Sequence, residues 1–231
     1  MGFLGVPMWV WGAGAGLLIL LPAKKVVAAI RKTGHGDPEP YLTTIRRAVV
    51  RHPELDKTHP TGHTGVSVLV GLFDQESKFD PTARSKTGAA GLGQFTMVAV
   101  DEVKRLIAMS KYRGRFDTTT AGRLNSFSKD LAVSDPHLAI EAAALLMAEL
   151  LRKWKGNVEA ALTDYNAGGK AAGIVASAGS HSMAKATLEN LDPREKSQSP
   201  VYAPEVVARA GYFREHGITG FGNYVRSYDE S

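Results

Sequence analysis

The chain has 231 residues, 44% of them hydrophobic and 22% charged, which fits a globular protein and excludes a fibrous or wholly disordered one. The absence of cysteine excludes disulfides and thiolate metal sites. The net charge of +5 favours anionic partners such as lipid or an acidic envelope polymer. The basic residues form no dense block, so we expect no nucleic acid partner.

The first 23 residues carry no charged side chain and contain the apolar run MWVWGAGAGLLILL. As a helix, this run would nearly match a hydrocarbon core about 30 Å thick. We therefore expect residues 1–32 to be a membrane-inserting segment, with 1–23 as the membrane contact. Gly12 and Gly16 offer a close helix-packing face, which predicts a homo-oligomer. A buried core helix and an unusual signal sequence remain alternatives.

Further along the chain, TGHGDPEP at 33–40 predicts a linker, which leaves 41–231 as one domain. A polar, Gly/Ser/Thr-rich stretch at 110–130 predicts a mobile surface insertion. No alternating run is long enough to predict a strand, so the fold class is mainly α. Apolar periodicity and capping signals predict helices over 41–51, 66–77, 96–109, 137–154, 158–165 and 204–215.

Three histidines, His52, His59 and His63, lie close together and raise the possibility of a metal site. Pro60 and Gly62 disfavour a regular helix between the last two, and no motif positions a carboxylate beside them. We therefore expect exposed loop histidines and no metal. The glycine-rich stretch that ends at Phe95 follows no strand and lacks a phosphate-binding lysine, so we expect no nucleotide and no other cofactor.

Four separated stretches form a pattern: Glu76-Ser77 at the end of a predicted helix, SKTGAAGLGQF at 85–95, a helix opened by Asp135-Pro136, and ALTDYNAGG at 161–169. Over roughly residues 60–215 this pattern resembles the soluble lytic transglycosylase (SLT) family, lysozyme-like enzymes that cleave peptidoglycan glycan strands. The resemblance implies a goose-type-lysozyme-like helical domain, here preceded by an N-terminal hydrophobic helix.

The resemblance assigns roles residue by residue. Glu76 would be the catalytic acid and then the base, and Tyr165 would hydrogen-bond and orient it. Ser85, Gln94 and Asn166 would hold the N-acetyl and peptidyl parts of the saccharide. Ser77 is equally well explained as a helix-end residue or as a ligand contact. The substrate-binding set is thus Ser77, Ser85, Gln94, Tyr165 and Asn166.

The residues around Glu76 predict its chemistry. Phe73 and the apolar turn would partly desolvate the carboxyl and keep it protonated as an acid. The nearby carboxylates, Asp74 and Asp80, are poor second catalytic groups, because Asp74 points to another helix face and Asp80 precedes a turn proline. A single carboxylate favours a lytic transglycosylase with a 1,6-anhydro product. A goose-type muramidase, or a non-catalytic virion or secretion-channel component, are the alternatives.

The sequence departs from the family pattern at three places. Gly93 stands where the family usually has Met, Asp164 stands where a small apolar residue is usual, and residues 198–202 match the family's Glu-Thr-x-x-Tyr segment only loosely. These departures concern the substrate subsites rather than the acid.

The expected location follows from function and charge together. The basic residues after position 23 predict a cytoplasmic C-terminal part for a protein inserted by its own cell, whereas peptidoglycan lies outside that membrane. We therefore expect the protein at the periplasmic side of the bacterial envelope, or in a phage virion that delivers it there.

Overall fold

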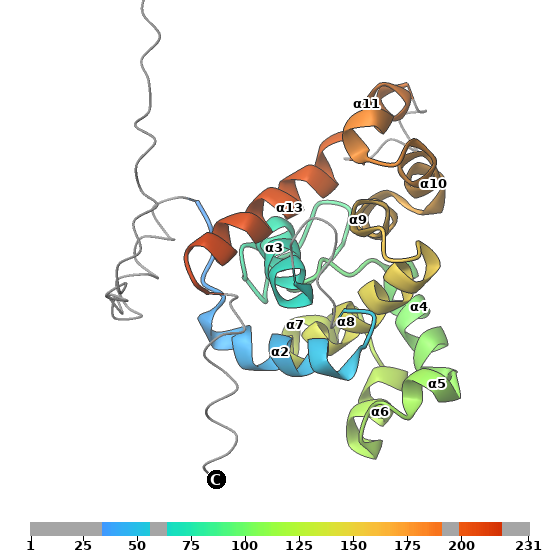
Figure 1. Cartoon of the computed structure of the whole chain (residues 1–231). Coiled ribbons are helices and arrows are strands. Elements are labelled where there is room, and N and C mark those ends of the chain that lie inside the picture. The colour runs from blue at the N-terminus through green and yellow to red at the C-terminus, as the bar shows by residue number, and fades with distance from the viewer. Residues whose placement is uncertain (1–33, 56–63, 191–198, 219–231) are drawn as a thin grey trace, which may run out of the picture.

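The structure is a computed structural model that describes residues 34–55, 64–190 and 199–218. This part is built of helices, and its β pairing is limited to two isolated bridges, Arg84–Ala90 and Ala90–Phe95. The prediction of a mainly α fold is confirmed (Figure 1). The elements are η1 (Glu39–Tyr41), α2 (Leu42–Arg51), α3 (Gly65–Ser77), α4 (Met97–Ala108), α5 (Ser110–Arg113), α6 (Thr118–Asn125), α7 (Lys129–Ser134), α8 (Pro136–Lys153), α9 (Val158–Ala167), α10 (Gly169–Ala178), α11 (His181–Glu189) and α13 (Ser199–Glu215).

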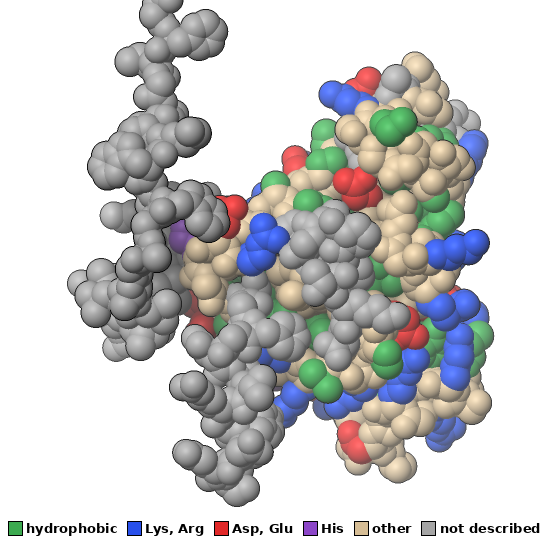
Figure 2. All heavy atoms as spheres, viewed as in Figure 1, with side chains coloured by type: hydrophobic (Ala, Val, Ile, Leu, Met, Phe, Trp, Pro, Cys, Tyr) green, Lys and Arg blue, Asp and Glu red, His purple; other side chains and the backbone are tan. Residues whose placement is uncertain are grey.

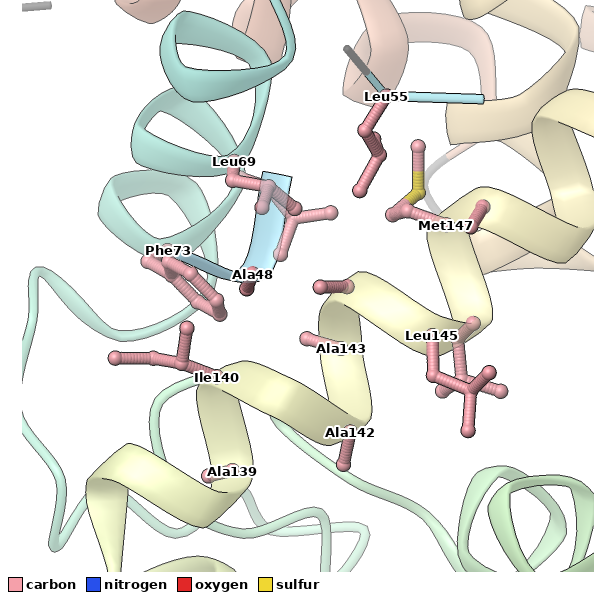
Figure 3. Close-up of a cluster of buried hydrophobic side chains, with 14 of the residues drawn as sticks. Ala48, Leu55, Leu69, Phe73, Ala139, Ile140, Ala142, Ala143, Leu145 and Met147 are labelled. Atoms are coloured by element: carbon pink, nitrogen blue, oxygen red, sulfur yellow. The ribbon is translucent and has the colours of Figure 1, made fainter. Parts of the chain in front are cut away.

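Helix α8 is the centre of the core. It begins as the sequence predicts, with Asp135 accepting a hydrogen bond from the Leu138 N–H at 3.0 Å and proline in the first turn. α2, α4, α7 and α9 pack against it. Figure 3 shows Ile140 of α8 and Phe73 of α3 among the side chains of this buried cluster. The core thereby fixes α3, the helix that carries the predicted acid.

Helix α13 packs along α3 at close range. A Cβ at Gly71 would lie 2.5 Å from the Val206 carbonyl oxygen, so only glycine allows this approach. The predicted helix at 204–215 exists but begins at Ser199, with Pro204 inside it. A proline usually marks the first turn of a helix, and this preference placed the predicted start too late.

The prediction of a mobile insertion at 110–130 is wrong. α5, α6 and α7 form there, and Tyr112 and Phe127 are fully buried in the core. The polar residues that suggested a loop cap helices instead: Asp117 caps the start of α6 and Ser128 that of α7. Large apolar residues are few and widely spaced in this segment, so no helical period was visible.

The predicted linker at 33–40 is attached to the domain where the structure describes it. His35 Nδ1 lies 2.5 Å from Asp74 Oδ2, and the Gly36 N–H donates to Asp74 Oδ1 at 2.7 Å. A Cβ at Gly36 would lie 1.9 Å from the Lys78 carbonyl oxygen, which explains the glycine. The chain entering from the N-terminal side is therefore joined directly to α3.

Within the described ranges, no helix has the length and apolar content needed to cross a bilayer. The predicted membrane-inserting segment, including Gly12 and Gly16, lies outside those ranges.

Candidate active site

Glu76 lies in the last turn of α3, and the backbone ends the helix just beyond it. Thr64 caps the start, where its side chain accepts from the Ser67 N–H at 3.3 Å. At the other end Lys78 and Phe79 both have positive φ, 55° and 61°, a conformation that cannot continue a right-handed helix. The chain turns away two residues after Glu76 and leaves this carboxyl beside α13.

The carboxyl of Glu76 is largely enclosed by protein. Its hydrogen bond is with Tyr202 of α13, whose hydroxyl donates to Glu76 Oε1. Burial disfavours the charged form and raises the pKa of Glu76 to about 7, against the opposite effect of the hydrogen bond from Tyr202. Below neutral pH Glu76 therefore retains its proton, and near neutral pH a large fraction of the protein still carries it, which is the state that a general acid needs.

The predicted hydrogen bond from Tyr165 to Glu76 is replaced by another arrangement. The Tyr165 hydroxyl donates to the Gly93 carbonyl oxygen at 2.9 Å, and Tyr202 occupies the position beside the acid. Burial, and then the negative charge of Glu76, raise the pKa of both tyrosines well above the ordinary value. Sequence reasoning missed Tyr202 because residues 198–202 match the family pattern loosely. The tyrosine that ends this stretch was the available signal.

The absence of a side chain at Gly93 makes room for Tyr165. A Cβ at Gly93 would lie 2.9 Å from the Tyr165 hydroxyl oxygen and 3.0 Å from a ring carbon of Phe95. Both distances are too short for unstrained contact, so one ring would have to move. Gly93, which stands where the family usually has Met, therefore leaves the space in which Tyr165 can hydrogen-bond to the Gly93 carbonyl oxygen.

Ser85 and Gln94 hold the loop between α3 and α4 in shape. Ser85 Oγ accepts from the Ala89 N–H at 2.9 Å. Gln94 Nε2 donates to the carbonyl oxygens of Gly91, at 3.0 Å, and Ala83, at 3.2 Å. Ser85 and Gln94 thus stabilise the loop, a structural role that was not predicted from the sequence.

A groove of about 750 Å³ runs from this loop between α4, α8 and the end of α9. Gly93, Gln94, Tyr165 and Asn166 line its near end. Asn166 Oδ1 is buried and has no hydrogen-bond partner within the described part of the chain. A buried acceptor without a donor is costly, so a ligand N–H or O–H at this position would be stabilised.

Two predicted substrate-binding residues, Ser77 and Ser85, are not among the residues that line the groove. The Ser77 hydroxyl donates to the Phe73 carbonyl oxygen at 3.2 Å, which is the helix-end role. Of the predicted set, the structure brings three residues together at the groove: Gln94, Tyr165 and Asn166.

Comparison with known proteins identifies the family of this chain. The Transglycosylase SLT domain family matches residues 59–187, which is more than half of the chain. The chain belongs to this family. The lytic transglycosylase Slt from Pseudomonas aeruginosa, solved as an inactive Glu-to-Gln variant, shares the fold, with a TM-score of 0.53 and 17% identity over 84% of this chain. The match spans 28% of the length of that protein. No curated protein matches the chain.

Around Glu76, the candidate acid of this SLT domain, the two candidate second carboxylates are engaged elsewhere. Asp74 is fully buried and accepts from His35, Gly36 and Arg209. Asp80 is exposed and accepts from the N–H of Thr82 at 2.8 Å, as a turn residue does. Neither carboxylate hydrogen-bonds to Tyr202, the residue that contacts Glu76. This arrangement fits the expectation that Asp74 and Asp80 are poor second catalytic groups.

The histidines of the SLT domain do not form a metal centre in the part that the structure describes, where no group of three potential ligands occurs. His52 is fully buried rather than exposed, which corrects the sequence-based expectation. Burial, and then the charge of Arg115, lower the pKa of His52 to about 4, so it is neutral in the folded protein. His59 and His63 lie outside the described residues.

Proposed function

We propose that this protein is a peptidoglycan lytic transglycosylase. It would cleave the β-1,4 bond between N-acetylmuramic acid and N-acetylglucosamine and leave a 1,6-anhydromuramyl end. The observation that carries the proposal is Glu76, a largely enclosed carboxyl with a pKa near 7 and no second carboxylate beside it in the described structure. Membership of the SLT family supports the same class of reaction.

The chemistry needs one group that first gives and then takes a proton. Protonated Glu76 donates its proton to the glycosidic oxygen as the bond to the muramyl C1 breaks, which leaves an oxocarbenium-like centre at C1. The resulting carboxylate accepts the proton of the muramyl 6-hydroxyl while O6 attacks C1. The ring closes, Glu76 is protonated again, and no water is consumed.

Tyr202 and the groove residues support these steps. The Tyr202 hydroxyl donates to Oε1 of Glu76, so it would orient the carboxyl and stabilise the anion formed midway. The unpartnered Oδ1 of Asn166 would accept a hydrogen bond from the N-acetyl N–H or a sugar hydroxyl. Gln94 and Tyr165, on the same stretch of groove, would contact the same saccharide.

A muramidase would use a second carboxylate to hold water or to act as a nucleophile. Mass spectrometry of muropeptides released from purified peptidoglycan separates the two reactions. We expect 1,6-anhydro ends, lighter by one water than the reducing ends that hydrolysis leaves. Reducing ends would reject the transglycosylase in favour of the hydrolase. Complete absence of cleavage would favour a non-catalytic structural component of a virion or secretion channel.

We also propose that residues 1–32 insert in a membrane and place the domain at the periplasmic side of the envelope, or serve a phage virion in the same way. The uncharged run at 1–23 supports insertion. The periplasmic side, or delivery there by a virion, is proposed from the position of peptidoglycan and not from the basic residues after position 23, which favour the opposite side. A close face at Gly12 and Gly16 would allow self-association there. Deleting residues 1–32 should release the protein from detergent-requiring fractions with cleavage retained. A full-length protein that stays monomeric without detergent would contradict both proposals.

A further inference from the structure

Gln75, the residue before the candidate acid on α3, holds α13 at two points. Its side-chain oxygen accepts from Arg209 Nε at 2.5 Å, and its Nε2 donates to Glu205 Oε2 at 2.7 Å. Glu205 and Arg209 are four residues apart on α13, so they lie on the same face, one turn from each other. Figure 1 shows α13 lying along α3. Because one amide spans a full turn of α13, it fixes this helix along its own axis as well as toward α3.

Tyr202 lies in the first turn of α13, where backbone hydrogen bonds give little support. The N–H groups of a first helical turn have no partner within the helix. Pro204 has no N–H at all, so the helical hydrogen bond that would reach back into this turn is missing. The position of the Tyr202 hydroxyl therefore depends on what holds the next turn. Glu205, three residues after Tyr202, is held there by Gln75.

Two other contacts keep α13 docked on α3 without Gln75. Asp74 accepts from Arg209 Nη1 at 2.6 Å, which is two turns away from Tyr202. The close approach at Gly71, where a Cβ would lie 2.5 Å from the Val206 carbonyl oxygen, sets the distance between the helices. Cohesion of the two helices thus has other sources, and the bond to Glu205 concerns the end of α13 that carries Tyr202.

We propose that Gln75 is a positioning residue that acts through Tyr202: its hydrogen bonds to Glu205 and Arg209 set the first turn of α13 so that the Tyr202 hydroxyl meets the Glu76 carboxyl. The consequence for cleavage rests on the proposed function, because it requires Glu76 to be the acid. A hydroxyl that donates to a carboxylate stabilises the charged form, so a looser contact should raise the pKa of Glu76.

The test replaces Gln75 with Met, which keeps the length of the side chain and its neutral charge but removes both hydrogen bonds. The pKa of Glu76 is measured from the carbon NMR resonance of its carboxyl group, which is assigned by its absence in Glu76→Gln. We expect the pKa to rise in Gln75→Met, by less than in Tyr202→Phe, and to rise no further when the two changes are combined. The decline of kcat/KM with pH should move in the same direction.

The exchange is neutral for neutral, so a change in titration reports on geometry and not on charge. Figure 2 shows Lys and Arg side chains gathered over α4, α5 and the end of α8, to the right of α3 and α13 in this view, and the exchange alters none of them. Thr44→Val is the matched control, because it removes an exposed hydrogen bond of 2.7 Å between α2 and His137 of α8. It should leave the pKa of Glu76 unchanged. Gln75→Asn, too short to span both partners, is the second variant and should act as Gln75→Met does.

Three results would overturn the proposal: an unchanged pKa in both Gln75 variants, a fall in the pKa because water reaches the carboxyl, or an equal rise in the Tyr202→Phe background. Circular dichroism verifies folding of each variant. The titration needs no substrate, so the two proposals fail separately. The expected titration without cleavage would refute the proposed function and retain the role of Gln75, whereas cleavage with an unaltered titration would do the reverse.

Discussion

Helix α3 carries two carboxylates, Asp74 and Glu76, on opposite faces. Two residues along a helix turn the side chain by about 200°, so Asp74 points to the start of the described chain and Glu76 to Tyr202 of α13. Asp74 is fully buried, and it accepts from Arg209 Nη1 at 2.6 Å and the Gly36 N–H at 2.7 Å. Glu76 has the single donor Tyr202 in the described structure.

The two faces differ in how the surrounding donors offset the loss of water around the carboxyl. Around Asp74, cationic and N–H donors offset the loss of water, so a buried carboxylate can join the N-terminal chain, α3 and α13. Around Glu76, burial is compensated by one hydroxyl, and the proton is retained to about pH 7. Similar side chains two residues apart thus become a structural anchor and an acid, according to the number and charge of their donors.

Replacing Glu76 with Gln should have the largest effect on catalysis. With the only acid/base removed, cleavage of peptidoglycan should fall by roughly 10²–10⁴-fold or more. The folded pKa near 7 exceeds the ordinary 4.5, so Glu76 costs stability as pH rises through this window. The variant should therefore match the parent near pH 4 and exceed it at pH 8 by up to about 3 kcal/mol in unfolding free energy. Undiminished cleavage would reject the site.

Replacing Asp74 with Asn should have the opposite effect: a large loss of stability with little change in cleavage activity. Loss of the charge leaves Arg209 and His35 facing a neutral amide, which should cost about 3–5 kcal/mol of stability in denaturant unfolding. The fraction that remains folded should retain most of its cleavage activity, because Asp74 has no part in the proposed chemistry. Asp80→Asn, at an exposed turn, is the control and should cost less than about 1 kcal/mol. Loss of activity in a folded Asp74→Asn protein would contradict the assignment of Asp74 to stability and of Glu76 to the chemistry.

Replacing Tyr202 with Phe should have an intermediate effect. Cleavage should decline above pH 7 in the parent, because protonated Glu76 is needed at the start. The Tyr202 hydrogen bond lowers the pKa of Glu76, so its loss should move this decline to higher pH. kcat/KM measured against pH tests this shift. Tyr165→Phe is the control, since its hydroxyl bonds to Gly93, and an equal shift there would contradict the assignment.

Replacing Gly93 with Ala should have the smallest effect. The added Cβ would lie 2.9 Å from the Tyr165 hydroxyl, so the ring should move by a few tenths of an ångström and weaken its bond to the carbonyl. We expect cleavage to fall by a few-fold with little change in melting temperature. Gly122→Ala, where a Cβ meets nothing within 4 Å, should leave cleavage unchanged. Equal behaviour of the two variants would show that Gly93 does not set the position of Tyr165.

Much of the site was predictable because its signals are short-range. The acid at the end of an apolar helix, the turn with Gln94 and the Tyr165-Asn166 pair are each read within a few residues. The hydrogen-bond partners of these residues could not be predicted from the sequence. The Tyr202 hydroxyl reaches Glu76 across 126 positions, and Tyr165 bonds a carbonyl 72 positions away.

The sequence by itself determined the mainly α class and the start of α8 at Asp135, and it singled out Glu76 as the candidate acid. Capping, helical period and motif spacing act locally and leave a local trace. Only the tertiary structure decided that Asp74 is an anchor, that Tyr202 holds Glu76, and that the polar stretch at 110–130 belongs to the core. Burial and hydrogen-bond pairing depend on which distant segments meet, and that is settled by packing of the whole chain.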